Sequence, residues 1–173
     1  CILCLIYGIR SILRNFDWKN PEKFFEKTGK EANYPARAKD QLAFILLNKG
    51  DYKKAYEILK SEVKKNPDDP DLLLNYGASL IRLGKYREAE EVYKKILKKN
   101  PKNYKSFHDL AVIYEKKGDY KKAEEFIFKA IKINPYYAKG YYQLGKINYI
   151  KGEIKKAKRY LEKSIEIDPD YAY

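Results

Sequence analysis

Few residues in this sequence have the types and spacing that metal binding or redox chemistry requires. The chain has one histidine, His108, and two cysteines, Cys1 and Cys4, which form a single C-x-x-C pair. A redox pair of this kind is expected beside a strand–helix–strand pattern, and a zinc site needs a second pair of ligands. The sequence offers neither context, so we expect no metal site and no cofactor.

Motifs typical of enzymes are also missing. The sequence contains no phosphate-binding loop of the GxxxxGK[ST] type and no HExxH helix, the local patterns on which those chemistries depend. A single histidine cannot supply a credible Ser-His-Asp set. The carboxylate pair Asp68-Asp69 fits a turn and the pair Glu90-Glu91 fits a charged helix, so we interpret both as solvated surface. The chain is therefore predicted not to be an enzyme.

The net charge raises the question of an anionic partner. The chain carries 37 basic and 24 acidic residues, a net charge of +13, which is typical of proteins that bind nucleic acids or anionic membranes. The excess is spread along the sequence, and lysine pairs such as Lys94-Lys95 and Lys121-Lys122 alternate with glutamates such as Glu90. This pattern favours a solvated helix face with ion pairs three or four residues apart. A nucleic acid partner is therefore not expected.

The composition and the first residues bear on the compartment. The apolar run Cys1–Ile9 is nine residues long, too short to span a bilayer, so no transmembrane segment is expected. Without a disulfide framework, a reducing cytoplasm is the expected location. The sequence has no methionine, so we expect a fragment or a processed product. Abundant lysine, glutamate, isoleucine and tyrosine would also suit a thermophile.

The elements that carry these residues follow a pattern that occurs four times at an interval of 34 residues. Each copy begins with glycine, has alanine five residues later and has proline seventeen residues later. A fixed period of this length indicates a repeat architecture. The glycines are Gly50, Gly84, Gly118 and Gly152, the alanines are Ala55, Ala89, Ala123 and Ala157, and the prolines are Pro67, Pro101, Pro135 and Pro169.

The repeated residues predict a pair of antiparallel helices in each copy. Glycine fits the position just past a helix end, where a left-handed backbone costs other residues roughly 1 kcal/mol or more. Asparagine or aspartate before proline ends the second helix, because the residue before proline avoids the α region. Small residues at matched places, among them Gly145 and Ala157, let the two backbones approach closely. A leucine at Ala89 should overpack by about 1 to 3 kcal/mol.

The period also places the helices along the chain. Residues 1–35 are interpreted as a decayed unit, in which Phe16-Asp17-Trp18 take the place of Gly50-Asp51-Tyr52 and Phe25 takes the place of Leu59. Helices are therefore predicted near 2–14 and 20–32. First helices of the four full units are predicted near 36–48, 70–82, 104–116 and 138–150, and second helices near 52–65, 86–99, 120–133 and 154–167.

This pattern resembles the tetratricopeptide repeat (TPR) family, whose signature has an aromatic residue, Leu-Gly, Tyr, Ala and Pro at fixed places. In the fourth copy the matching residues are Tyr141, Leu144, Gly145, Ala157 and Pro169. The resemblance implies an all-α fold, a right-handed α-solenoid (TPR superhelix) of antiparallel helix hairpins. Its repeats would be 36–69, 70–103, 104–137 and 138–171, after a degenerate N-terminal repeat or capping helices at 1–35.

The resemblance further implies a non-enzymatic protein–protein interaction module or scaffold. In the family, side chains of the first helices line a concave groove that binds extended or helical peptide segments of a partner protein. Basic groove residues could bind a partner's carboxylates, and exposed aromatic ones could make apolar contacts. The groove positions carried over to this sequence are Arg37, Gln41, Phe44, Asn48, Asp71, Asn75, Arg82, Lys105, His108, Asp109, Lys116, Lys139, Tyr142, Lys146 and Tyr149.

One branch of the family grips the C-terminal carboxylate of chaperones with two lysines, two asparagines and an arginine. Asn75 and Lys105 match that set, whereas Asp40, Phe44 and Asp109 stand at its other positions. Two anions at these places would repel a carboxylate terminus. A chaperone tail is therefore not the expected partner.

Two other hypotheses remain open. The apolar start and the uncapped end at 170–173 would suit a scaffold that self-associates as a homo-oligomer, because a terminal repeat without a polar cap exposes apolar surface. Basic faces of the second helices would suit RNA binding, which should weaken steeply with salt. The peptide-binding module is favoured over both.

Overall fold

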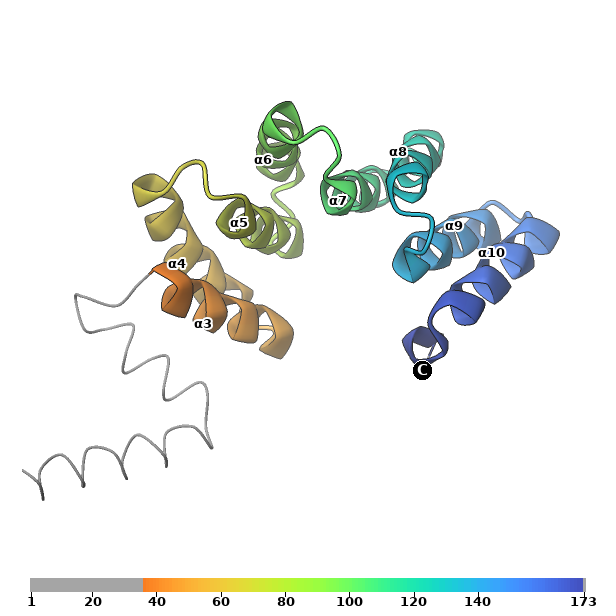
Figure 1. The fold of residues 1–173 in the computed structure, drawn as a ribbon, viewed down its shortest axis with the longest axis horizontal. Helices are drawn as coiled ribbons and strands as arrows, with labels where there is room; N and C mark the ends of the chain where they lie inside the picture. Colours follow the sequence, from red (N-terminus) through yellow and green to blue (C-terminus); the bar gives the residue numbers. More distant parts are fainter. Residues whose placement is uncertain (1–35, 173) are drawn as a thin grey trace, which may run out of the picture. The chain divides into compact units, whose positions relative to one another are not determined.

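The structure, a computed structural model, describes residues 36–172, and within this range every regular element is a helix (Figure 1). The helices predicted near 2–14 and 20–32 lie outside the described residues. The first helices of the hairpins are α3 Ala36–Lys49, α5 Pro70–Arg82, α7 Tyr104–Lys116 and α9 Ala138–Ile150. The second helices are α4 Tyr52–Lys65, α6 Tyr86–Lys99, α8 Tyr120–Ile133 and α10 Ile154–Ile167, and a short 3-10 turn, η1, follows at Pro169–Ala172.

The helix positions predicted from the period are confirmed. Seven of the eight described α-helices have the predicted bounds, and α3 extends one residue further, to Lys49. The four repeat glycines all have a positive φ, between +74° and +89°. At Gly84, for example, the amide N–H donates to Ile81 at 3.0 Å and the next amide, of Lys85, donates to Leu80 at 2.9 Å. This geometry satisfies carbonyl groups at the end of the first helix.

Polar side chains fix several of the helix starts. The Asn103 side chain accepts a hydrogen bond from the amide of Ser106 at 2.9 Å, and Asp119 accepts one from the amide of Lys122 at 3.1 Å. These contacts satisfy amide groups that have no partner inside the helix. The hairpins therefore begin and end where the short-range sequence dictates.

The described residues form two compact units that divide between Ser79 and Leu80, so the boundary lies inside α5 and not in a linker. In the first unit, α3 packs against α4. Apolar side chains of α3, α4 and the start of α5 form one core. Its buried residues are Leu42, Ala43, Leu46, Ala55, Leu59 and Leu72.

In the second unit, α7 packs against α8 and α9 packs against α10. Ala111, Ala123, Ile127, Leu144 and Ile147 form a buried core that joins the two hairpins. A Cβ atom on Gly145 would lie 2.6 Å from Cγ of Leu161, so α9 and α10 approach too closely for a larger residue there. Ala89 is completely buried, as a position that excludes a larger side chain should be.

Candidate peptide-binding surface

In the structure, the side chains of the sequence-predicted groove residues differ in solvent exposure. Asn75, Asp109 and Lys146 are half-buried, and His108 is buried. Arg37 lies in α3, but its side chain is outside the described part of the chain. The exposed members of the set are Gln41, Phe44, Asn48, Asp71, Arg82, Lys105, Lys116, Lys139, Tyr142 and Tyr149.

In the first unit, the candidate residues form an acidic and amide-rich surface on α3 and α5. Asn75 donates a hydrogen bond from Nδ2 to Oδ1 of Asp40 at 2.7 Å, which joins the two helices. Burial raises the pKa of Asp40, the bond from Asn75 opposes this, and the charges of Asp69 and Asp71 raise the pKa further. Acidic groups thus face one another here, so this surface does not favour an anionic ligand.

In the second unit, Glu115 joins the first helices α7 and α9. Gln143 donates to Oε2 of Glu115, and Nζ of Lys146 lies 2.7 Å from Oε1 of the same carboxylate. Glu115 and Gln143 are both buried. A buried carboxylate must be paired with donors to offset its desolvation, and these two bonds hold the two helices side by side.

An exposed stripe of lysine and tyrosine runs along α9. Lys139, Tyr142, Lys146 and Tyr149 are spaced three, four and three residues apart, so they lie on one face of the helix. Tyr142 is 41% exposed and Tyr149 is 66% exposed. Alternating aromatic and cationic side chains on one helix face can contact apolar and acidic groups of the same ligand.

Lysines of α7 add to the positive charge of this surface. Within residues 39–170, Lys105 and Lys116 on α7 and Lys139 on α9 make no ion pair. Oδ1 of Asp109, on the same helix, lies 3.0 Å from Nδ1 of His108. We name Lys105, Lys116, Lys139, Lys146, Tyr142 and Tyr149 the α7–α9 surface.

His108 is buried and packs inside the second unit instead of lining a surface. Its ring is 3% exposed, and its Nδ1 lies 3.0 Å from Oδ1 of Asp109. The ring of Tyr137, just before α9, packs edge-on against it with centroids 5.6 Å apart. His108 is therefore not a contact residue of the α7–α9 surface.

Sequence reasoning missed Tyr93 as a partner of Asp109. Tyr93 is fully buried on α6 and is hydrogen-bonded to Asp109. Burial raises the pKa of the Tyr93 hydroxyl well above its ordinary value, and the charge and hydrogen bond of Asp109 raise it further. The available signal was a tyrosine at the core position that Leu59 and Ile127 occupy in other repeats, since a buried hydroxyl needs a partner.

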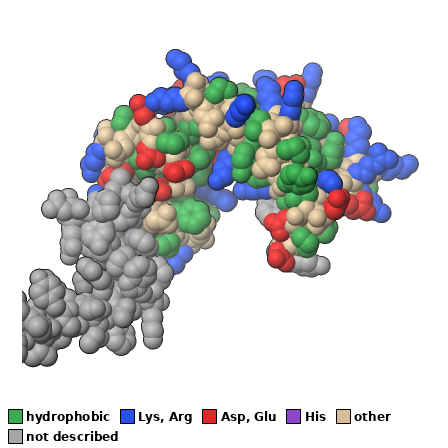
Figure 2. All heavy atoms as spheres, in the orientation of Figure 1, with side chains coloured by type: hydrophobic (Ala, Val, Ile, Leu, Met, Phe, Trp, Pro, Cys, Tyr) green, Lys and Arg blue, Asp and Glu red, His purple; other side chains and the backbone are tan. Residues whose placement is uncertain are grey.

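The part of the chain that the structure describes gives no support for a metal site or a membrane-spanning helix. Among the described residues, no group of three or more histidine, cysteine or acidic residues is placed to hold a metal ion. None of the described helices is long and apolar enough to cross a membrane. Cys1 and Cys4 lie outside the described range. On the face drawn in Figure 2, Lys and Arg side chains are spread over the described helices with Asp and Glu between them.

Comparison with family models identifies the repeat. One tetratricopeptide repeat model matches residues 46–108 and 80–139, and a second tetratricopeptide repeat model matches 138–171. No curated protein sequence matches the chain. Together the matched ranges span residues 46–171.

Solved structures with the same fold include a MamA fragment, residues 41 to the end, from Desulfovibrio magneticus RS-1. It has 23% sequence identity and a TM-score of 0.73, and the match covers 93% of each chain. TTC0263, a thermophilic TPR protein in Thermus thermophilus, has 23% identity and a TM-score of 0.72 over 78% of this chain and 75% of that one. At this identity the similarity concerns the fold alone, an all-α helical-repeat solenoid.

Proposed function

The chain belongs to the tetratricopeptide repeat family, and from this premise we propose that it binds an acidic, extended segment of a partner protein across α7 and α9. The family match supports the broader role of a protein–protein interaction scaffold. Neither the sequence nor the described residues supply a catalytic set, so the proposed role is non-enzymatic. A cytoplasmic location is part of the proposal, since the cysteines occur only at 1 and 4 and cannot form a disulfide framework.

The stripe of lysine and tyrosine on α9 is the observation that carries the proposal. The rings of Tyr142 and Tyr149 lie on one helix face and leave apolar area in contact with water. Burying this area against a partner would be favourable. Lys139 and Lys146 lie between and beside these rings. An extended segment in which carboxylates alternate with apolar side chains would satisfy both kinds of residue.

The preference for an acidic ligand follows from the charge left unpaired on the α7–α9 surface. Lys105, Lys116 and Lys139 have no carboxylate partner among residues 39–170. Asp109 is held by Tyr93 and His108, and Glu115 is buried under Gln143 and Lys146. The carboxylates of this region are therefore engaged internally, whereas its cations remain available for charge-assisted bonds to a ligand.

A matched set of peptides tests the proposal. A fluorescently labelled peptide that alternates aspartate with leucine should bind the chain, and versions with asparagine or lysine in place of aspartate should bind more weakly. The variant Lys105→Glu/Lys139→Glu should weaken binding of the aspartate peptide by about tenfold or more, because two attractive contacts become repulsive. Fluorescence anisotropy measures the dissociation constants.

A control variant separates local contact from long-range charge. Lys121→Glu/Lys132→Glu changes the net charge equally, but both lysines are exposed on the second helix α8. This variant should bind the aspartate peptide nearly as the unaltered chain does. Equal loss of affinity in both variants would contradict a site on α7 and α9. Salt-sensitive RNA binding that only the α8 variant weakens would instead support the basic second helices.

A further inference from the structure

Glu115 is a buried carboxylate next to the α7–α9 surface. Its side chain is 7% exposed, whereas the side chain of Lys146, whose Nζ lies 2.7 Å from Oε1 of Glu115, is 41% exposed. Gln143, which is buried, donates to the other carboxylate oxygen. A ligand can therefore reach the ammonium group of Lys146 but not the carboxylate that holds it.

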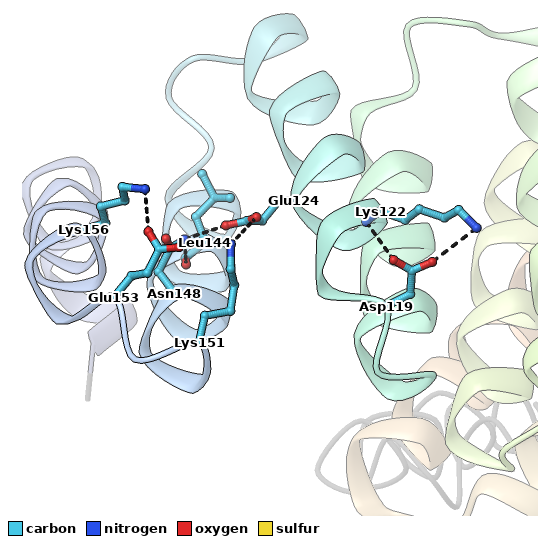
Figure 3. Close-up of polar contacts among 8 residues, drawn as sticks. All are labelled: Asp119, Lys122, Glu124, Leu144, Asn148, Lys151, Glu153 and Lys156. Carbon is cyan, nitrogen blue, oxygen red and sulfur yellow. Dashed lines mark hydrogen bonds and ion pairs between the residues drawn. The ribbon is translucent and has the colours of Figure 1, made fainter.

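Other glutamates of the same unit make a similar contact away from this surface. Oε2 of Glu124 on α8 lies 2.8 Å from Nζ of Lys151, and Asn148 donates to Oε1 of Glu124 at 2.9 Å (Figure 3). Glu90 on α6 likewise lies 2.7 Å from Nζ of Lys117. Both ion pairs join residues 27 positions apart, so this contact is repeated and holds successive hairpins together.

The contact between Glu115 and Lys146 is not repeated along the chain. Uncharged residues occupy the position of Glu115 in the other three copies, namely Leu47, Ile81 and Tyr149. Uncharged residues also occupy the position of Lys146, namely Phe44, Ala78 and Val112. The other copies of the repeat thus do without this pair, so its effect is local to α7 and α9.

Burial of the carboxylate keeps Lys146 in place. If Lys146 turned toward a ligand, Glu115 would keep only the bond from Gln143, and a buried carboxylate that loses its paired cation is costly. A ligand carboxylate that approached Nζ would also be repelled by Glu115 on the other side of the same ammonium group. The charge of Lys146 is therefore largely neutralised before a ligand binds.

We propose that Glu115 determines which carboxylates of the ligand this surface recognises, because it withholds Lys146 from the ligand. The inference rests on the proposed peptide-binding function and adds a specificity-determining residue to it. Carboxylates of the bound segment pair with the other lysines of the α7–α9 surface. Opposite Lys146 the segment carries an uncharged side chain, which packs between Tyr142 and Tyr149.

Glu115→Gln tests this role because it removes the charge and nearly keeps the shape of the side chain. Lys146 then becomes available, so the aspartate peptide should bind about threefold more tightly, the effect of one surface ion pair. Glu115→Gln/Lys146→Met should return the affinity to that of the unaltered chain, because the added cation is removed again. A purely structural role of Glu115 would give weaker binding instead. Fluorescence anisotropy measures the dissociation constants, and circular dichroism checks the helical fold of each variant.

Glu124→Gln is the matched control, because it makes the same change of charge in the contact drawn in Figure 3. Lys151 keeps a second carboxylate, Glu153, at 3.4 Å, and neither Glu124 nor Lys151 belongs to the α7–α9 surface. This variant should bind the aspartate peptide as the unaltered chain does. Equal tightening in Glu124→Gln and Glu115→Gln would overturn the proposal, since total charge alone would then explain both.

NMR of the unaltered chain gives a test that does not require a variant to fold. An ammonium group held by a carboxylate exchanges its protons slowly, so Lys146 should give a side-chain proton–nitrogen signal that persists when the aspartate peptide is added. Loss of this signal, or unchanged affinity of folded Glu115→Gln, would overturn the inference and leave the peptide-binding proposal intact. If the aspartate peptide bound the unaltered chain no better than the asparagine version, the proposed function itself would fail, and this inference with it.

Discussion

Glu90 shows how one carboxylate can join two hairpins of the second unit. It contacts Lys117 at 2.7 Å, Lys94 at 2.8 Å and the hydroxyl of Tyr114 at 2.8 Å. The bonds from Lys117 and then Lys94 lower the pKa of Glu90 from its ordinary 4.5 to about 2, although partial burial opposes them. Ionised Glu90 is therefore favoured by the folded state.

A pH titration of stability tests this role. Because the folded pKa lies below the unfolded value, the contribution of Glu90 is present above pH 4.5 and is lost as the pH falls toward about 2. Glu90→Gln should reduce the unfolding free energy at pH 7 by about 1 kcal/mol, since its lysine partners are largely exposed, and the deficit should shrink in acid. Urea unfolding across pH measures this, with the exposed Glu91→Gln as control. A deficit of constant size would contradict the explanation.

Asp109 was predicted as a groove residue, and in the structure its carboxylate contacts two buried polar side chains. It interacts with the Tyr93 hydroxyl and with Nδ1 of His108. Removing its carboxylate would leave two buried polar groups without this partner. A structural role and a ligand-binding role predict different effects on stability.

Two substitutions compare these roles. Tyr93→Phe removes one hydrogen bond and should cost about 0.5 to 1.5 kcal/mol, whereas Asp109→Ala should cost more, about 2 to 3 kcal/mol, because it leaves buried groups unsatisfied. Urea unfolding followed by circular dichroism gives both values. If Asp109→Ala left stability unchanged while weakening peptide binding, Asp109 would belong to the ligand surface instead.

At the scale of elements, two glycines of the repeat act through different physical constraints. Gly118 has φ of +77°, and a Cβ atom there would meet no atom within 4 Å. Gly145 lies inside α9, where a Cβ atom would approach Leu161 to 2.6 Å and the carbonyl oxygen of Ala157 to 3.2 Å. Alanine at Gly118 therefore strains only the backbone, whereas alanine at Gly145 strains the packing of α9 on α10.

Alanine at each position, combined with a smaller neighbour, distinguishes these constraints. Gly118→Ala should cost about 1 kcal/mol, and Gly145→Ala about 1 to 3 kcal/mol despite the higher helix propensity of alanine. Adding Leu161→Ala should make Gly145→Ala less costly than it is alone, and it should leave the cost of Gly118→Ala unchanged. Thermal unfolding of these variants and of Leu161→Ala alone measures both couplings, and equal couplings would contradict this assignment.

The helices could be predicted because their ends depend on short-range chemistry. Gly84 needs a left-handed backbone and Asn100 precedes a proline, and each constraint acts within a few residues. The burial of His108 could not be predicted in this way. The same repeat position holds the exposed Tyr142 in the next copy, whereas His108 is buried and its ring packs against Tyr137. Contacts of this kind depend on side chains from other helices.

For the candidate surface, the sequence could predict which side chains are exposed but not which groups bond to one another. The exposure of Lys139, Tyr142 and Tyr149 followed from transferring one helix face from repeat to repeat. The bonds that hold α7 beside α9, from Gln143 and Lys146 to Glu115, involve a buried acid that has no counterpart in that transfer. Only the packed structure shows that this carboxylate is unavailable to a ligand.

For the molecule as a whole, the net charge of +13 is distributed and does not mark one polyanion site. Glutamates at repeated positions, such as Glu90 and Glu124, neutralise lysines of the neighbouring hairpin. Lys105, Lys116 and Lys139 on α7 and α9 differ from these lysines, because the carboxylates near them are already bonded to other side chains of the protein. Specific binding is therefore expected to depend on a few lysines and not on total charge.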